Sequence, residues 1–227
     1  MNRRMLPAVV AGCLMFGGPL ATAVPSLAEA IRFVAPGRAV AQVPTYEDVV
    51  GRPFGERLTE HHEMVTYLRA VAEASPRVSV VSQGTSWEGR ELMLAVVTSP
   101  ENHARLEEIR RASLRLDDPR TASAEEAGSL IETQPVIAWF GGSIHGNESS
   151  GAEGALMLLE HLSTRDDAAT LEALDDVIVL IDPVLNPDGR DAWAQFNHRR
   201  VGRDPSPETD DWSNDATGWE GTGFRTG

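Results

Sequence analysis

Residues 136–150 read VIAWFGGSIHGNESS, and this stretch decides the fold that we expect for the chain. Its first five residues, 136–140, are apolar and predict a buried strand. Two glycines follow and allow a sharp turn, because glycine has no Cβ atom that could clash. A helix is predicted over residues 150–163, since Ser150-x-x-Glu153 fits a capping box. A buried strand that leads through a turn into a helix is typical of α/β proteins.

The rest of the chain supplies further elements of both kinds. The turn-rich segment 84–90 favours antiparallel pairing of the two strands that flank it. Residues 176–181 are almost wholly apolar, as in strands whose sheet is covered by helices on both faces. Together these patterns predict an α/β fold with a mixed central sheet flanked by helices. The further predicted helices are 57–75 and 101–116, and the further predicted strands are 77–83, 91–98 and 176–181.

Four more local features are predicted. Helical spacing places Leu106, Ile109 and Leu114 on the inner face of their helix. Residues 117–134 are polar and rich in alanine, which predicts a short helix and a loop. Residues 193–227 combine many acidic, glycine and proline residues with no apolar periodicity, so we expect a long, exposed functional loop there. On the helix 150–163 the expected inner face consists of Ala155, Leu156, Leu158, Leu159 and Leu162.

Residues 1–30 have the pattern of a cleaved export signal, with Arg3 and Arg4 before a short apolar stretch. Residues 31–227 would then form the domain of a secreted or periplasmic protein. A membrane anchor and a lipoprotein signal at Cys13 are the alternatives, but the apolar runs are shorter than the roughly 20 residues of a spanning helix. Cys13 is the only cysteine, so the exported domain would contain no disulfide.

The charge balance is strongly acidic. The 227 residues include 34 acidic and 20 basic side chains, for a formal net charge of −14. A surface of this sign repels polyanions. We therefore expect no nucleic-acid partner and, once the signal is removed, no anionic membrane partner.

His145 and Glu148 are the candidate metal ligands. They lie past a predicted strand and before a predicted helix, and ligands of open α/β sheets gather at such strand ends. Imidazole and carboxylate groups both bind Zn²⁺, and a spacing of three residues can bring them to one point. The alternative is a surface hydrogen bond, or a carboxylate that favours a helix N-terminus. The remaining histidines before residue 190 lack this setting and are expected to be structural; they are His61, His62, His103 and His161.

A second informative stretch, residues 182–190, reads DPVLNPDGR and follows the other apolar strand. Its Asn-Pro and Asp-Gly dipeptides predict a sharp turn out of the sheet. With this stretch included, the chain resembles the zinc carboxypeptidase family of the carboxypeptidase A and B type. The motifs that carry the resemblance are EGREL (88–92), GGSIHGNE (141–148) and NPDGR (186–190), in the family's order.

The resemblance implies a site that hydrolyses C-terminal peptide bonds of peptides or proteins. His145 and Glu148 would be the first two zinc ligands, and residues 186–189 would form a neighbouring wall. In this family an arginine that polarises the scissile carbonyl follows NPDG by a short distance. Arg199 and Arg200 fall in this window, as does Arg203, although a solvated basic cluster is an equal alternative.

The chain also departs from the family pattern. The family's third ligand, a histidine, and its glutamate base lie far downstream, and His198 is too close to Asn186 to be that ligand. We therefore expect an N-terminal portion of such an enzyme, inactive alone, whose C-terminal part is missing. A zinc deacylase of the aspartoacylase type, which shares HGNE, is one alternative to a secreted zinc carboxypeptidase. A non-catalytic binding domain is the other.

Overall fold

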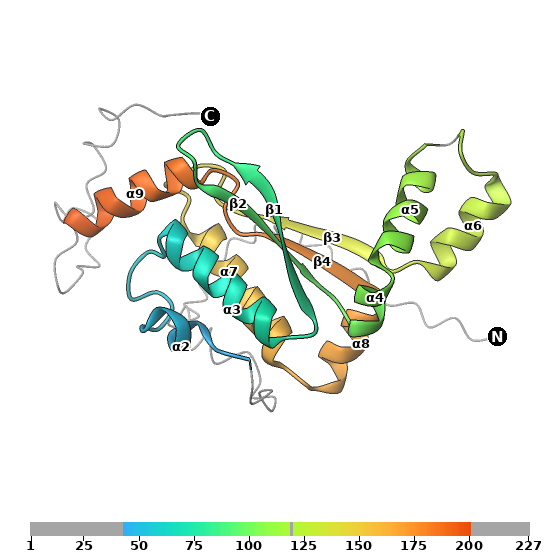
Figure 1. The fold of residues 1–227 in the computed structure, drawn as a ribbon, viewed down its shortest axis with the longest axis horizontal. Helices are drawn as coiled ribbons and strands as arrows, with labels where there is room; N and C mark the ends of the chain where they lie inside the picture. The colour runs from blue at the N-terminus through green and yellow to red at the C-terminus, as the bar shows by residue number, and fades with distance from the viewer. Residues whose placement is uncertain (1–42, 119, 201–227) are drawn as a thin grey trace, which may run out of the picture. The chain divides into compact units, whose positions relative to one another are not determined.

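The computed structural model describes residues 43–118 and 120–200. The strands in this part of the chain are β1 (Val78–Thr85), β2 (Glu91–Val97), β3 (Val136–Gly141) and β4 (Val177–Asp182). They form one sheet in the order β1-β2-β4-β3. The pairs β1–β2 and β2–β4 are antiparallel, whereas β3 and β4 are parallel. This mixed sheet with its helices confirms the predicted α/β fold (Figure 1).

The helices predicted over 57–75 and 150–163 are present as His61–Ala74 and Ser150–Thr164, whereas those at 46–50, 168–176 and 187–200 were not predicted. The helix predicted over 101–116 is divided in two, because Arg105 has non-helical backbone angles (φ −123°, ψ 19°). The short helix predicted within 117–134 is present, and Ser123 and Glu126 form a capping box at its start. The helices of the described residues are α2 (Tyr46–Val50), α3 (His61–Ala74), α4 (Pro100–Ala104), α5 (Leu106–Asp117), α6 (Ala124–Thr133), α7 (Ser150–Thr164), α8 (Ala168–Asp176) and α9 (Pro187–Arg200).

The main core lies between the sheet and the helices α3 and α7, which run side by side on one face (Figure 1). Tyr67 and Leu68 of α3 and Leu156 and Leu159 of α7 are fully buried there. Burial of one such side chain stabilises the fold by about 1.5–3 kcal/mol. The predicted inner face of α7 is confirmed: Ala155 is also buried, and Leu158 and Leu162 pack against the cluster.

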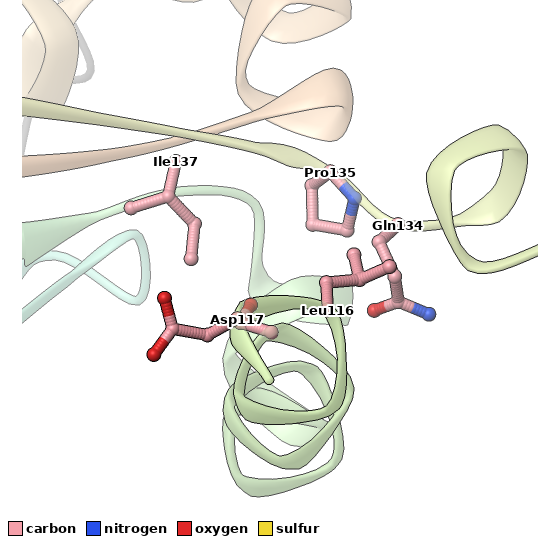
Figure 2. Close-up of a pocket in the computed structure, with 6 residues that line it drawn as sticks. Leu116, Asp117, Gln134, Pro135 and Ile137 are labelled. Atoms are coloured by element: carbon pink, nitrogen blue, oxygen red, sulfur yellow. The ribbon is translucent and has the colours of Figure 1, made fainter. Parts of the chain in front are cut away.

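The opposite face of the sheet is covered less completely. Ile109 of α5 packs with Val96 and Ile178, while Leu106 lies at the margin of this smaller cluster. The expectation that Leu114 faces inward was wrong, because its side chain is 55% exposed. Near it, two pockets of about 390 and 500 Å³ share Ser113, Asp117 and Ile137. Figure 2 shows Leu116 and Asp117 of α5 opposite Ile137 and Pro135 across the smaller pocket.

β3 differs from the buried strand that its sequence predicts. It is one of the two edge strands of the described sheet, and all six of its residues are exposed. Val136 is 66% exposed and Trp139 is 62% exposed. The prediction was wrong because apolar composition does not specify whether a strand has a neighbour on both sides.

The segment after β4 also differs from the expectation. The sequence predicts a long loop over residues 193–227, but residues 193–200 continue α9, and residues 201–227 lie outside the described part. Asn186 starts the helix: its Oδ1 accepts a hydrogen bond from the backbone N–H of Gly189 at 3.0 Å, and Pro187 is the first helical residue. Asparagine before proline is thus a helix start here, since both residues favour these positions.

The predicted export signal, residues 1–30, also lies outside the described residues. None of the described helices has the length and apolar character needed to span a bilayer.

Candidate metal centre

The loops that follow β3 and β4 lie side by side, because these parallel neighbours end at the same edge of the sheet. The backbone N–H of Gly142 donates to the carbonyl of Asp182 at 2.8 Å, and that of Leu185 donates to Gly142 at 2.9 Å. The N–H of Asn186 donates to the carbonyl of Ser143 at 3.3 Å. These bonds continue the strand pairing beyond the sheet and fix one loop to the other.

Gly146 brings the first loop directly against the first turn of α9. A Cβ atom at this position would lie 2.1 Å from the carbonyl oxygen of Gly189 and 2.8 Å from the backbone nitrogen of Arg190. Real Cβ atoms do not approach backbone atoms so closely, so glycine is required here. Asn186 adds a second contact, since its Nδ2 donates to the carbonyl of Ile144 at 3.2 Å.

Ser143 carries backbone strain within the same loop. Its φ of 48° is the one positive φ of a non-glycine residue among the residues described. Its side chain is buried, and its Oγ has no hydrogen-bond partner there. Strained backbone persists where the surrounding structure holds it, and such positions are common at functional sites.

His145 and Glu148 come together at the mouth of this loop. Nδ1 of His145 lies 3.0 Å from Oε2 of Glu148, and the backbone N–H of Glu148 donates to the carbonyl of His145 at 3.0 Å. Both side chains are more than half exposed. The loop therefore presents one imidazole nitrogen and one carboxylate oxygen to solvent at a common point.

The two side chains form a hydrogen bond with each other, and their separation would also suit two ligands of one zinc ion. Two atoms that each bind a tetrahedral zinc ion at about 2.0–2.2 Å are roughly 3.4 Å apart, close to the observed separation of 3.0 Å. In residues 43–118 and 120–200, no cluster of three histidine, cysteine or acidic side chains is placed to hold a metal ion. Within this part of the chain, His145 and Glu148 can thus supply two ligands.

Behind the loops, a buried ion pair joins α9 to α7. The guanidinium of Arg190 is fully buried and lies 2.5 Å from Oε1 of Glu153. Burial lowers the pKa of Arg190, although the carboxylate of Glu153 opposes this shift. Glu153 also accepts hydrogen bonds from the backbone N–H and the hydroxyl of Thr59, at 2.8 and 2.7 Å. The predicted capping box between Ser150 and Glu153 was therefore wrong, because buried distant partners occupy the carboxylate.

The connector between β1 and β2 contacts the first turn of α9 on its other side. Arg90 of the EGREL motif forms ion pairs of 2.8 Å with both Asp188 and Asp191. The hydroxyl of Ser86 donates to Asp188 at 2.7 Å. Burial alone would raise the pKa of Asp188, but the bonds from Ser86 and Arg90 lower it below its usual value. Sequence reasoning missed this network; the opposite charges of EGREL and NPDGR were the available signal.

Of the candidate arginines, Arg199 is the one whose side chain is described, because Arg203 lies outside the described residues. Arg199 is ten residues after Gly189 on α9, which corresponds to about 15 Å along a helix. Its side chain is exposed, and its Nε donates to the carbonyl of Gln195 at 3.0 Å. Arg200 ends α9, and its side chain lies outside the described set. Polarisation of a carbonyl by Arg199 or Arg200 stays a prediction.

Three other histidines contact backbone carbonyl groups or a carboxylate. Nε2 of His61 lies 2.7 Å from the carbonyl of Glu91, and Nε2 of His103 lies 2.9 Å from that of Arg77. His62 is exposed and lies 3.5 Å from Glu60. In contrast to His145, none of these three is in a loop at the carboxyl end of a strand.

The chain is similar to one known protein family. The family described as zinc carboxypeptidase matches residues 64–222. The comparison with curated proteins gives no match.

Solved structures of carboxypeptidase type also match. Thrombin-activatable fibrinolysis inhibitor is 15% identical, with a TM-score of 0.45, over 65% of this chain and 31% of that chain. Carboxypeptidase A from Helicoverpa armigera is 20% identical, with a TM-score of 0.44, over 72% and 32%. The bovine inhibitor in complex with tick carboxypeptidase inhibitor is 17% identical, with a TM-score of 0.37, over 61% and 34%. The matched region spans about a third of each of these structures.

Proposed function

Because the chain belongs to the zinc carboxypeptidase family, we propose that it forms part of a zinc-dependent peptidase that removes C-terminal residues from peptides or proteins. The single observation that supports this most is the 3.0 Å approach of His145 to Glu148 in the loop after β3, beside the end of the parallel strand β4. The two residues are proposed as zinc ligands. A further ligand and the base that activates water would come from outside residues 43–200.

The roles of the chain's own residues follow from their chemistry. To bind a cation, Nδ1 of His145 must be free of its proton and Glu148 must be ionised. Zinc, when bound, acidifies a water molecule and polarises a carbonyl group. The hydrogen bonds between the two loops keep both ligands in place, and the exposure of both side chains leaves room for a substrate.

Export is part of the same proposal. Residues 1–30 would be removed as a signal, and residues 31–227 would belong to the peptidase domain of a secreted or periplasmic protein. Edman sequencing of the protein recovered from the culture medium or periplasm tests this. A mature N-terminus near residue 31 is expected, and an intact Met1 on the recovered protein would contradict it.

Hydrolysis assays of the complete gene product test the activity. N-blocked dipeptides with a free C-terminal carboxylate should be cleaved, and the same dipeptides with an amidated C-terminus should not. H145A and E148A should each lose at least about 100-fold of the activity, in line with the loss of a metal ligand. H62A is the matched control, because this exposed histidine lies outside the strand-end loops, and it should retain full activity.

The assay also separates the alternatives. Cleavage of N-acyl amino acids in place of dipeptides would support a deacylase of the aspartoacylase type. Zinc binding without turnover of either substrate would support a non-catalytic binding domain. Peptide cleavage that is unchanged in H145A would contradict the proposed site.

A further inference from the structure

We propose that Arg90 is a positioning residue for the metal loop: it fixes the first turn of α9 and, through that turn, the loop that carries His145 and Glu148. This inference rests on the proposed function for its consequence in zinc binding. Its structural step concerns only contacts between described residues.

Arg90 is joined to α9 by two ion pairs. Its Nη1 lies 2.8 Å from Oδ1 of Asp188, and its Nε lies 2.8 Å from Oδ2 of Asp191. The two aspartates are three residues apart and therefore lie on one face of the helix. One guanidinium spans both carboxylates because its donors are arranged in a rigid planar fork. A lysine ammonium is a single point charge and would not reproduce this pair of contacts.

The first turn of α9 also contacts the metal loop. The carbonyl oxygen of Gly189, next to Asp188, lies 2.1 Å from the position that a Cβ atom of Gly146 would take. Asn186 holds the loop from the same turn through its bonds to Ser143 and Ile144. With no side-chain atoms between the two backbones, a displacement of the turn must displace the loop or open the contact.

Arg90 makes no direct bond to the metal pair within the described residues. Among the described residues, no hydrogen bond or ion pair joins Arg90 to His145 or Glu148. The remaining partners of Arg90, Glu88 at 2.6 Å and Ser86 through the backbone, lie on the same connector. The contacts that lead from Arg90 to the metal loop therefore run through the first turns of α9.

Hydrogen exchange tests the structural step without metal. In R90Q, the amides of Leu185 and Asn186, which bond across the two loops, should exchange about tenfold faster, while the amides of β4 stay protected. R69Q is the matched control, because Arg69 forms an exposed ion pair of 2.5 Å with Glu91, just after the same connector. Unchanged exchange in R90Q would overturn the proposal, as would equal acceleration in R69Q.

Zinc affinity of the folded proteins, measured by competition with a chelating dye, tests the consequence. R90Q should bind zinc about tenfold more weakly than the wild type, R90K should be intermediate, and R69Q should be unchanged. The visible spectrum of the Co²⁺-loaded protein should shift in R90Q and not in R69Q.

The role of Arg90 and the proposed zinc peptidase function are contradicted by different results. A wild type that binds zinc through His145, with R90Q of equal affinity, overturns the role of Arg90 alone. A wild type that binds no zinc overturns the proposed function and the zinc consequence together, while the exchange experiment still decides the structural step. If R90Q fails to fold, S86A removes one bond to Asp188 and should give a smaller change in the same direction.

Discussion

β3 and β4 are parallel neighbours of similar composition, but only β4 is largely protected from solvent. Ile178 and Ile181 of β4 are 3% and 1% exposed, whereas Val136 and Trp139 of β3 are 66% and 62% exposed. β4 lies between two strands, whereas β3 has one neighbour within the described sheet. An apolar run therefore indicates that burial would stabilise a strand. Whether the strand is buried depends on the elements that lie next to it.

At their carboxyl ends the same two strands do not differ in this way, because both lead into loops that contact each other. There the loops are joined by backbone hydrogen bonds, and Gly146 packs against Gly189 without any side chain between them. Both candidate ligands, His145 and Glu148, follow the exposed strand β3, and the loop after the covered strand β4 supports them through these backbone contacts.

Substitution of Gly146 by alanine is expected to have the largest effect, because it attacks the contact that joins the two strand ends. The new Cβ atom would overlap the backbone of Gly189, so the variant should lose about 3 kcal/mol or more in its free energy of unfolding. Urea denaturation followed by circular dichroism measures this loss.

G154A provides the control for that substitution. Gly154 lies in α7 with nothing within 4 Å of the added Cβ atom, so G154A should be neutral or more stable by up to about 1 kcal/mol. If G146A were as stable as G154A, the two loops could not be packed as described.

A matched pair of substitutions tests the contrast between the strands themselves. Ile137 and Ile178 face each other in the register of β3 and β4. I178A should cost about 2–4 kcal/mol in unfolding free energy, because it leaves a cavity in a buried cluster. I137A should cost less than about 1 kcal/mol, because Ile137 is already 43% exposed. Equal losses in denaturation experiments would show that β3 is covered in the protein.

Asp182, the last residue of β4, gives the smallest expected effect. Burial raises the pKa of its carboxyl group, against the hydrogen bond from Gln83. The folded state therefore binds the proton more tightly than the unfolded state, and stability is lost as the pH rises above the unfolded pKa. D182N should raise the unfolding free energy at pH 7 by up to about 1 kcal/mol and lose this advantage in acid. A gain that grows toward low pH would contradict the assigned shift.

Much of this arrangement could be predicted from the sequence. The position of His145 and Glu148 in a strand-end loop followed from an apolar run, two glycines and a helix start. The mixed sheet followed from periodicity and turn residues. These features depend on local sequence, and local patterns report them well.

The features that sequence reasoning missed depend on distant partners. Glu153 fits a capping box locally, but it binds Thr59 and Arg190, which are far from it in sequence. The pairing of Arg90 with α9 requires the hairpin connector to fold back on a segment almost 100 residues later. Only α9 itself had a local signal, since Asn186 and Pro187 are typical of a helix start.

Isothermal titration of the metal-free, complete gene product with zinc decides whether His145 and Glu148 hold a zinc ion. We expect binding of one zinc ion per chain that is lost in H145A and in E148A, while both variants keep their circular dichroism spectrum and H62A binds as the wild type does. Zinc binding of unchanged affinity and stoichiometry in H145A and E148A would contradict it.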